Sequence, residues 1–456
     1  MSLTEPRRIA LEVLRATRRG ELLDRALAAR AAGLPPRDRA WVQELVYGTV
    51  RLRGRLDTLL AAFVRRGVGS LQPDVRDTLR LGAYQLREMG GVPEYAAVSQ
   101  AVDMARAAAG SGAAGLVNGV LQALRREGDS VGFPSFEDDA LAHLTTWGSH
   151  PRWLVERWLR FFGPDATRAL VEANNTRPEL FLRPLGQPVA AALAALGAAD
   201  IQAARVSFAP DALRVAPPRT AVDALTAVPA VVQDPAAGLV ARYAAIPAGA
   251  IVADVCAAPG GKALVFAERA GYVAAADLSL ERLARVRENQ ARLPHLPVGL
   301  VVADARMPAF RAVDAVIVDA PCTGTGTFRR HPDGRWRLRP EDVVALARLQ
   351  YEILEAAAPL VRPGGWLVYA TCSLEPEENE ERMDAFLSAH PEFELDPPDA
   401  AVMGDPRLLD ERGRLVVRPW LFGVDAAFAA RLRRRAGDAG VAADALDPSG
   451  RERSAP

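Results

Sequence analysis

The chain has 456 residues, of which half are apolar and a quarter are charged, and its formal net charge at pH 7 is zero. This length predicts roughly two to four domains with a substantial core. The three cysteines include no CxxC pair, which excludes a disulfide framework and a zinc ribbon, and we expect no bound metal. No segment resembles a signal peptide or a membrane span, so we expect a cytoplasmic monomer without a membrane partner.

Charge is distributed unevenly along the chain. Residues 1–128 contain 20 arginines against 13 acidic residues, while the remainder contains 36 basic and 43 acidic residues. A basic module joined to an acidic body indicates a polyanionic partner for the first part, although a helical domain with an arginine-rich solvated face would have the same composition. Lys262 is the only lysine, which indicates that this position requires a compact ammonium group.

Residues 6–128 are predicted to be helical. Apolar residues recur at helical spacing between arginines, as in "PRRIALEVLRAT", and no stretch alternates in the manner of a strand. The glycine, proline and aspartate content of segment 128–140 is typical of a linker. We therefore expect an all-α domain over residues 1–130.

Residues 141–232 predict a small connecting subdomain of mixed structure. "HPRWLVERWLRFFG" and the alanine-rich "VAAALAALGAAD" have helical patterns, whereas "PELFLRPL" and "ALRVA" are typical of strands. We expect a compact α+β unit here.

From residue 235 the pattern changes to helices that alternate with short apolar runs. This pattern predicts an α/β domain over residues 233–435, with a mostly parallel, doubly wound sheet. In such sheets ligands bind at the carboxyl ends of the strands. The predicted strands are 250–256, 272–277, 298–304, 315–320 and 365–372.

The stretch "DVCAAPGGK" (254–262) ends the first of these strands and opens a helix. Gly260 and Gly261 allow a tight turn and a close approach of the backbone to a ligand, and the helix N-terminus adds free N–H donors. Asp277 and Asp304 end the next two strands, where an acid can accept hydrogen bonds from ribose hydroxyls or an exocyclic amine. Together these features predict a site for an adenosine-containing ligand, although each aspartate alone could instead be a helix cap.

Two of the three cysteines follow neighbouring predicted strands. Cys322 lies in "DAPCTGTG" after the fourth strand, and Cys372 lies in "YATCSLEPEENE" after the fifth. Two thiols at one sheet edge, without metal-ligand spacing, predict nucleophilic catalysis, in which a thiolate attacks an electrophilic carbon and a second group helps to release it. Cys256, at the end of the first strand, is expected to be a structural thiol beneath the ligand.

The motifs "CAAPGGK", "DLS", "DAR", "DAPCTGTG", "FRRHPD" and "YATCSLEPEENE", in this order and spacing, resemble the Sun/nucleolar-protein family of RNA cytosine-C5 methyltransferases, which use S-adenosylmethionine. "RDRAWVQELVYGTVR" and "GLVNGVLQAL" resemble the NusB-like RNA-binding domain of the bacterial 16S rRNA members, and "ANNTRPELFLRP" resembles the family's connecting domain. The resemblance covers residues 5–435 and implies a class I, Rossmann-like methyltransferase domain. The composition of residues 436–456 predicts a disordered tail.

The resemblance implies a role for each candidate residue. It assigns attack on cytosine C6 to Cys372, assisted elimination to Cys322, and a contact with the N3/N4 edge of the base to Asp319. Lys262 would orient the base or bind a phosphate. From the residues alone the order of the two thiols stays open, because Pro321-Cys322 resembles the Pro-Cys nucleophile of DNA cytosine methyltransferases. The implied cofactor-binding residues are Cys256, Ala257, Ala258, Pro259, Gly260, Gly261, Lys262, Asp277, Asp304 and Asp319.

The segment "FRRHPDGRWRL" (328–338) follows Cys322 closely and is predicted to contact RNA. Arg329, Arg330 and Arg335 could bind phosphates and Trp336 could stack on a base, because basic and aromatic side chains are common partners of unpaired RNA. Trp336 could equally be a core aromatic.

Two positions depart from the family pattern. Ala237 stands where the family often has serine, which puts a local helix cap in doubt. "DAAF" (425–428) stands in place of Asp-Gly-Phe-Phe, which suggests an altered final strand near the base pocket.

The predicted function is methylation of cytosine C5 in 16S rRNA, because the NusB-like module favours the small ribosomal subunit. One alternative is the same reaction on tRNA or large-subunit rRNA. Another is a non-catalytic RNA-binding assembly factor, which the intact thiol pair, Lys262 and the glycine loop disfavour.

Overall fold

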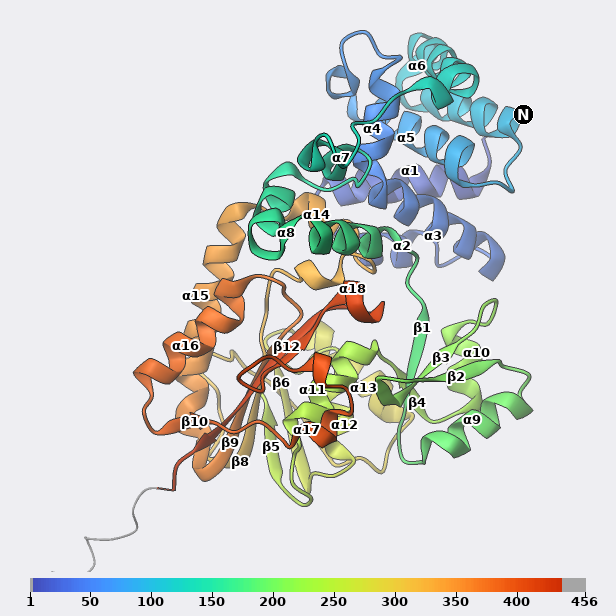
Figure 1. Ribbon diagram of the computed structural model, residues 1–456. Coiled ribbons are helices and arrows are strands. Elements are labelled where there is room, and N and C mark those ends of the chain that lie inside the picture. The colour runs from blue at the N-terminus through green and yellow to red at the C-terminus, as the bar shows by residue number, and fades with distance from the viewer. Residues whose placement is uncertain (1–2, 437–456) are drawn as a thin grey trace, which may run out of the picture.

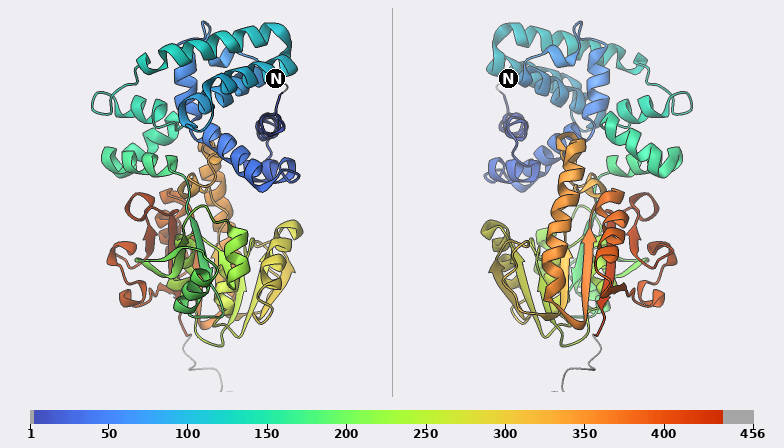
Figure 2. Two further views of the ribbon diagram at one scale, coloured as in Figure 1. Left: turned by 90° about the vertical axis from the view of Figure 1, so that its right-hand side faces the viewer. Right: turned by 90° about the vertical axis from the view of Figure 1, so that its left-hand side faces the viewer.

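The computed structural model describes residues 3–436, so the predicted tail lies outside the described residues apart from its first residue. The N-terminal helical domain lies at one end of the molecule, and two sheets lie side by side at the other (Figure 1). Helix α15 (Pro340–Ala357) extends from the larger sheet domain toward the helical domain (Figure 2). The fold class predicted from the sequence is confirmed.

The N-terminal domain is all-helical, as predicted. Its helices bury one apolar cluster that includes Leu45, Leu79 and Leu121. Gly110 interrupts α6 with a φ of +85°, a left-handed conformation that glycine adopts without steric cost. Within residues 3–436, no helix is long and apolar enough to cross a membrane. The helices are α1 Glu5–Arg18, α2 Leu23–Arg30, α3 Pro36–Arg51, α4 Arg53–Ala61, α5 Pro73–Glu88 and α6 Glu94–Glu127.

The connecting domain joins a helical arm, α7 and α8, to a small sheet. The arm packs around Trp158, which is fully buried. The sheet is antiparallel throughout, with strand order β2-β3-β1-β4. The two helices and two strands expected from the sequence are present, and α7, β2, β4 and α10 add to them. The elements are α7 Ala140–Thr146, α8 Arg152–Asn175, β1 Leu180–Pro184, α9 Val189–Ala198, β2 Ala203–Val206, β3 Ala209–Val215, α10 Ala221–Ala227 and β4 Ala230–Val232.

The C-terminal domain is built on a sheet with strand order β10-β12-β9-β8-β5-β6-β7. Strands β5 to β9 are mutually parallel, as predicted, so the carboxyl ends of β5, β8 and β9 meet at one edge. All five predicted strands are present. The elements are α11 Pro235–Ala244, β5 Ile251–Asp254, α12 Gly261–Ala267, β6 Tyr272–Asp277, α13 Leu280–Ala291, β7 Val298–Val302, β8 Val313–Asp319, α14 Gly334–Arg337 and β9 Val361–Thr371.

Two strands in this sheet, β10 and β11, are absent from the sequence prediction, and β12 is the final strand that the family resemblance implied at "DAAF". β10, β11 and β12 pair antiparallel beside β9. The first two have only three residues each, and arginines interrupt the apolar run of β12, so none has a clear alternating pattern. "DAAF" enters β12, in which Phe428 is buried. The remaining elements are α16 Glu380–Ala389, β10 Phe393–Leu395, α17 Ala400–Met403, β11 Leu415–Val417, α18 Pro419–Phe422 and β12 Ala427–Arg434.

The helix cap that Ala237 put in doubt is present. Asp234, immediately before α11, accepts a hydrogen bond from the backbone N–H of Ala236 at 2.9 Å. Because the capping oxygen comes from the residue that precedes the helix, alanine at position 237 does not remove it.

Candidate active site

Four predicted catalytic side chains gather at the carboxyl edge of the large sheet. Asp319 ends β8, Cys322 follows in the next loop, Cys372 follows β9, and Lys262 lies in the first turn of α12. Lys262 Nζ is 2.8 Å from Asp319 Oδ2, and the Sγ atoms of Cys322 and Cys372 are 3.4 Å apart. The fold thus brings together side chains that are up to 110 positions apart in the sequence, from Lys262 to Cys372.

The two thiols differ in their electrostatic surroundings. The hydrogen bond with Cys322 lowers the pKa of Cys372 against the effects of burial and of the Asp319 carboxylate, and the Lys262 ammonium also lowers it. Hydrogen bonding to Cys372 and burial raise the pKa of Cys322 well above its usual range, and the Glu378 carboxylate adds to this. Because the thiolate is the nucleophilic form, this asymmetry favours Cys372 as the attacking group and Cys322 as its thiol partner.

Lys262 keeps its charge in a partly buried position. Burial alone would lower the pKa of this ammonium group, but the nearby Asp319 carboxylate more than offsets that effect, so the pKa of Lys262 is raised. A fixed positive charge therefore lies beside Cys372 and beside the residue expected to contact the base.

The loop between β5 and α12 requires glycine at position 260. Gly260 has a φ of +97°, and a Cβ there would lie 2.6 Å from a methyl group of Val286. The loop is held against the next strand, because the backbone N–H of Ala257 donates to the carbonyl of Ala276 at 2.8 Å. The backbone is thus fixed close to the carboxyl ends of β5 and β6, where the predicted ligand would lie.

The two strand-end aspartates are each engaged in local contacts. Asp277 is buried, accepts a hydrogen bond from the backbone N–H of Ser279 at 2.9 Å, and lies 3.3 Å from Arg282 Nη1. Asp304 pairs with Arg306 at 2.7 Å, and these hydrogen bonds lower the pKa of Asp304. Both carboxylates lie at the ligand edge, and their cofactor contacts remain predictions.

A further carboxylate at this edge was missed in the sequence analysis. Asp254, the last residue of β5, is fully buried, and neither of its oxygens makes a well-formed hydrogen bond, although the backbone N–H of Cys256 lies near. Burial and the charge of Asp319 raise the pKa of Asp254 to about 8. A perturbed acid in this position is typical of functional sites. The sequence feature that could have identified Asp254 is its position at the end of a predicted strand, at the start of "DVCAAPGGK".

Cys256 is consistent with its predicted structural role. It packs against the apolar cluster on one face of the large sheet, and burial together with the nearby Asp254 and Asp319 carboxylates raises the pKa of its thiol. A thiol kept protonated in this way is a poor nucleophile. Among the described residues, no group of three or more His, Cys, Asp and Glu side chains is arranged to hold a metal ion.

The segment predicted to contact RNA, residues 328–338, is a junction between the domains. Arg335 is fully buried, and its guanidinium donates to the Arg51 carbonyl at 3.4 Å, the Asn174 carbonyl at 3.0 Å and Asn175 Oδ1 at 2.9 Å. The phosphate contact predicted for Arg335 is therefore wrong, because the group is shielded from solvent and bonded to the two preceding domains.

The neighbouring arginines are also held within the protein. Arg329 is buried and donates to the Gly423 carbonyl at 2.5 Å. Arg330 pairs with Asp234 at 2.5 Å and with Asp425 at 2.8 Å. The phosphate contact predicted for Arg329 is therefore wrong, while that of the partly exposed Arg330 stays a prediction.

Trp336 packs against the core of the helical domain. Its Nε1 donates to the Val50 carbonyl at 2.8 Å, and the Arg53 guanidinium lies 4.9 Å from its ring centre. These contacts favour the core-aromatic interpretation over base stacking.

A cavity of about 280 Å³ lies beside Trp336, but a second cavity, of about 340 Å³, adjoins the thiol loop. The second lies between α2 and the C-terminal domain, and its lining includes Pro259 of the glycine loop and Thr323 and Gly324, which follow Cys322. Arg282 also lines it. The cavity therefore connects the glycine loop with the loop that carries one thiol.

Three family profiles match the chain in succession. They are described as the NusB family over residues 4–126, a ferredoxin-like domain of RsmF/B-like methyltransferases over 150–223, and 16S rRNA methyltransferase RsmB/F over 245–433. A Bacillus subtilis protein named probable ribosomal RNA small subunit methyltransferase B is 33% identical over 456 residues, which cover 95% of this chain and 100% of that protein. Ribosomal RNA small subunit methyltransferase B of Vibrio vulnificus is 36% identical and covers 83% of this chain and 89% of its own.

Solved structures show the same architecture. The crystal structure of PH0851 has a TM-score of 0.78 at 26% identity and covers 95% of this chain and 100% of its own. A methyltransferase homolog from Pyrococcus horikoshii has a TM-score of 0.56 at 27% identity and covers 65% of this chain and 99% of its own.

Proposed function

Since the chain belongs to the RsmB/F methyltransferase family, we propose that it methylates the C5 position of a cytosine in 16S rRNA, with S-adenosylmethionine as the methyl donor. The observation that supports this chemistry most is the contact between Cys322 and Cys372, 3.4 Å apart beside the Lys262–Asp319 ion pair. A cation beside one of two touching thiols stabilises one thiolate and leaves the other group as a proton donor.

The residues at the carboxyl edge fit an adenosine-containing cofactor. The glycine loop from Cys256 to Gly261 would lie along it, and Asp277, Asp304 and Asp319 would accept its hydrogen bonds. The close contact between Gly260 and Val286 and the poorly satisfied carboxylate of Asp254 are the features of this structure that support such a site. When bound, S-adenosylmethionine supplies an electrophilic methyl group.

The thiols would overcome the low nucleophilicity of cytosine C5. The Cys372 thiolate forms a bond to C6, which breaks the aromaticity of the ring and transfers an electron pair toward C5. C5 would then take the methyl group as the bond from the sulfonium sulfur to the methyl carbon breaks and S-adenosylhomocysteine leaves, and C5 would afterwards lose its proton to solvent. The electrons of that C–H bond restore the double bond as the bond from C6 to Cys372 breaks, and Cys322 assists this release. Asp319 contacts the N3/N4 edge of the base and stabilises the adduct.

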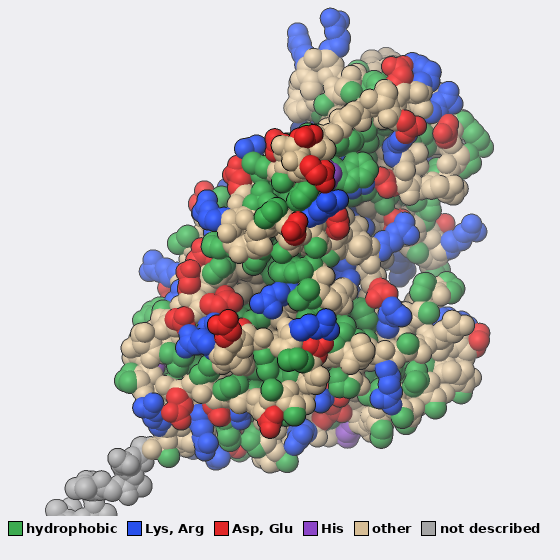
Figure 3. All heavy atoms as spheres, viewed as in Figure 1, with side chains coloured by type: hydrophobic (Ala, Val, Ile, Leu, Met, Phe, Trp, Pro, Cys, Tyr) green, Lys and Arg blue, Asp and Glu red, His purple; other side chains and the backbone are tan. Residues whose placement is uncertain are grey.

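The RNA would meet the protein on both sides of the cavity beside the thiol loop. A base must leave its stack to reach a site of this kind. Basic side chains project from the outer end of the helical domain on the face shown in Figure 3, with acidic ones among them. We propose that the arginine surplus of residues 1–128 contacts phosphates, and that binding weakens steeply as salt rises. The protein would act as a monomer in the cytoplasm.

Bisulfite mapping tests this proposal. One cytosine of 16S rRNA should be protected in the parent strain, unprotected in a strain lacking the gene, and protected again after purified protein and S-adenosylmethionine are added to the unmodified RNA. If the strain lacking the gene instead loses protection of a cytosine in tRNA or large-subunit rRNA, that RNA is the substrate. Unchanged protection in every RNA would favour the non-catalytic assembly factor.

A further inference from the structure

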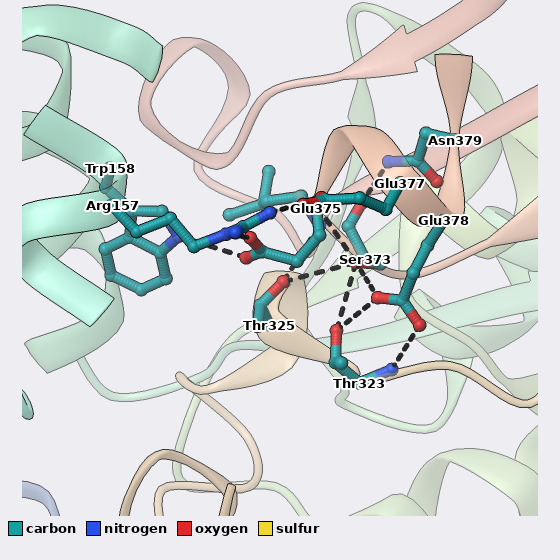
Figure 4. A network of polar contacts seen from close by, with 10 residues as sticks. Arg157, Trp158, Thr323, Thr325, Ser373, Glu375, Glu377, Glu378 and Asn379 are labelled. Atoms are coloured by element: carbon teal, nitrogen blue, oxygen red, sulfur yellow. Dashed lines mark hydrogen bonds and ion pairs between the residues drawn. The ribbon is translucent and has the colours of Figure 1, made fainter. Parts of the chain in front are cut away.

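Glu378 lies between the two loops that carry the thiols and is fully buried (Figure 4). Its carboxylate accepts hydrogen bonds from the backbone N–H of Thr323 at 2.9 Å and from the Thr323 hydroxyl at 2.5 Å, and the Ser373 hydroxyl also donates to it. Thr323 directly follows Cys322, and Ser373 directly follows Cys372. One carboxylate therefore binds the residue next to each thiol.

Glu378 is itself fixed by two other elements. Gln350 of α15 donates from Nε2 to the Glu378 carboxylate at 2.8 Å and to the Pro321 carbonyl at 3.0 Å. The Tyr369 hydroxyl, from β9, donates to the Glu378 carbonyl at 2.6 Å. Because these partners lie on a long helix and a central strand, the carboxylate is a rigid anchor for both loops.

The two loops also touch directly. The hydroxyls of Thr323 and Ser373 are 3.0 Å apart, and the backbone N–H of Leu374 donates to the Thr325 hydroxyl at 2.9 Å. Farther from Cys322, the backbone N–H of Gly326 donates to the Cys372 carbonyl at 3.0 Å. Without Glu378, the Thr323 N–H and the Gln350 amide would lose their acceptor in a buried position, where an unpaired donor is unfavourable. The part of the loop next to Cys322 would then be held less firmly, while Gly326 stays bonded to the Cys372 carbonyl.

We propose that Glu378 is a positioning residue, which locks the Cys322 loop against the Cys372 loop and so holds the releasing thiol within reach of the attacking one. The roles given to the two thiols rest on the proposed function, whereas the distance of 3.4 Å between their sulfur atoms does not.

The charge of Glu378 supports the same assignment. Its carboxylate faces Cys322 and opposes ionisation of that thiol, while Lys262 faces Cys372 and favours ionisation there. Glu378 would therefore keep the two thiols chemically distinct as well as close together.

A cross-linking experiment on the full chain tests the distance without RNA or cofactor. Diamide, a diazene, takes up two hydrogens as two contacting thiols join in a disulfide, and mass spectrometry of peptides identifies the pair. Glu378→Ala should form the Cys322–Cys372 disulfide roughly tenfold to a hundredfold more slowly than the wild type. The rate of disulfide formation in Glu378→Gln should lie between those of the wild type and Glu378→Ala, because the amide oxygen of glutamine keeps one acceptor. Glu381→Ala, at an exposed position nearby, should match the wild type.

If Glu378→Ala fails to fold, the comparison rests on Glu378→Gln. A cross-linking rate equal to that of the wild type in a folded Glu378 variant would overturn the proposal.

A second experiment separates positioning from a general role in stability. With RNA and S-adenosylmethionine, Glu378→Ala should still transfer a methyl group but release RNA slowly, so that a covalent protein–RNA species persists on denaturing gels. Parallel loss of methyl transfer and adduct would overturn the inference. A wild type that transfers no methyl group would contradict the proposed function instead, because the cross-linking experiment tests the distance between the thiols without RNA or cofactor.

Discussion

Two polar regions next to the same cavity use their ionisable groups in different ways. At the thiol site, the partners of Cys372 and Lys262 are other ionisable side chains, which alter protonation. In the junction segment 328–338, the partners of Arg335 are backbone carbonyls and an asparagine side chain, which have no protonation equilibrium near neutral pH. The first arrangement tunes reactivity, and the second joins domains.

This difference shows that burial alone does not identify a charged side chain that takes part in function. Lys262 and Arg335 are both largely inaccessible cations, but only Lys262 has a carboxylate and a thiol beside it. The kind of partner therefore distinguishes a reactive cation from a structural one, and each region should respond to mutation in its own way.

The largest effect on stability is expected for Arg335→Leu. The change leaves four buried carbonyls and the partly buried Asn175 side chain without their donor. Because each unpaired buried polar group costs about 1–3 kcal/mol, we expect the free energy of unfolding to fall by about 3–5 kcal/mol. Urea denaturation followed by circular dichroism measures this, with the exposed Arg337→Leu as a matched control. Equal midpoints for the two variants would show that the segment does not hold the domains together.

Mutation of a residue predicted to bind the cofactor should change the affinity for the ligand instead of the stability of the fold. Asp277→Ala removes an acceptor from a buried position, so calorimetry with S-adenosylhomocysteine should show binding weaker by about 1–3 kcal/mol. Glu281→Ala, an exposed acid on the adjacent helix, should bind as the wild type does. Unchanged affinity in Asp277→Ala would remove this residue from the site.

The smallest expected effect is a shift in pH dependence. Lys262→Gln removes the ammonium and leaves the negative charge of Asp319 beside Cys372, so the pKa of the thiol should rise. The thiolate is the reactive form, and alkylation of Cys372 by iodoacetamide should therefore begin at higher pH. Lys262→Arg keeps the charge and should shift the profile less. Superimposable profiles for wild type and Lys262→Gln would refute an electrostatic role for Lys262.

The sequence predicted the thiol site well because its residues belong to strand ends. Alternating helices and apolar runs define a parallel sheet, and the carboxyl ends of its strands must meet, so Cys322 and Cys372 could be placed together before any coordinates were known. Asp254 satisfied the same rule and was overlooked, since its unpaired burial is visible only in three dimensions.

The junction segment could not be predicted in this way. "FRRHPDGRWRL" has the composition of an RNA-binding loop, and nothing in its pattern shows that Arg335 meets carbonyls from residues more than 150 positions away. The short strands β10 and β11 were missed for a related reason, because pairing with β12 and not local pattern creates them.

The proposed mechanism depends most on the different roles of Cys322 and Cys372, and one gel experiment tests these roles. Purified Cys322→Ala, Cys372→Ala and, as a control, the exposed-site variant Glu381→Ala are each incubated with RNA and S-adenosylmethionine and analysed under denaturing conditions. Cys322→Ala should accumulate a covalent protein–RNA species because attack continues while release is slowed, Cys372→Ala should form neither adduct nor methylated RNA, and Glu381→Ala should turn over. An adduct in Cys372→Ala and none in Cys322→Ala would reverse the roles, and full methyl transfer by both variants would contradict the account.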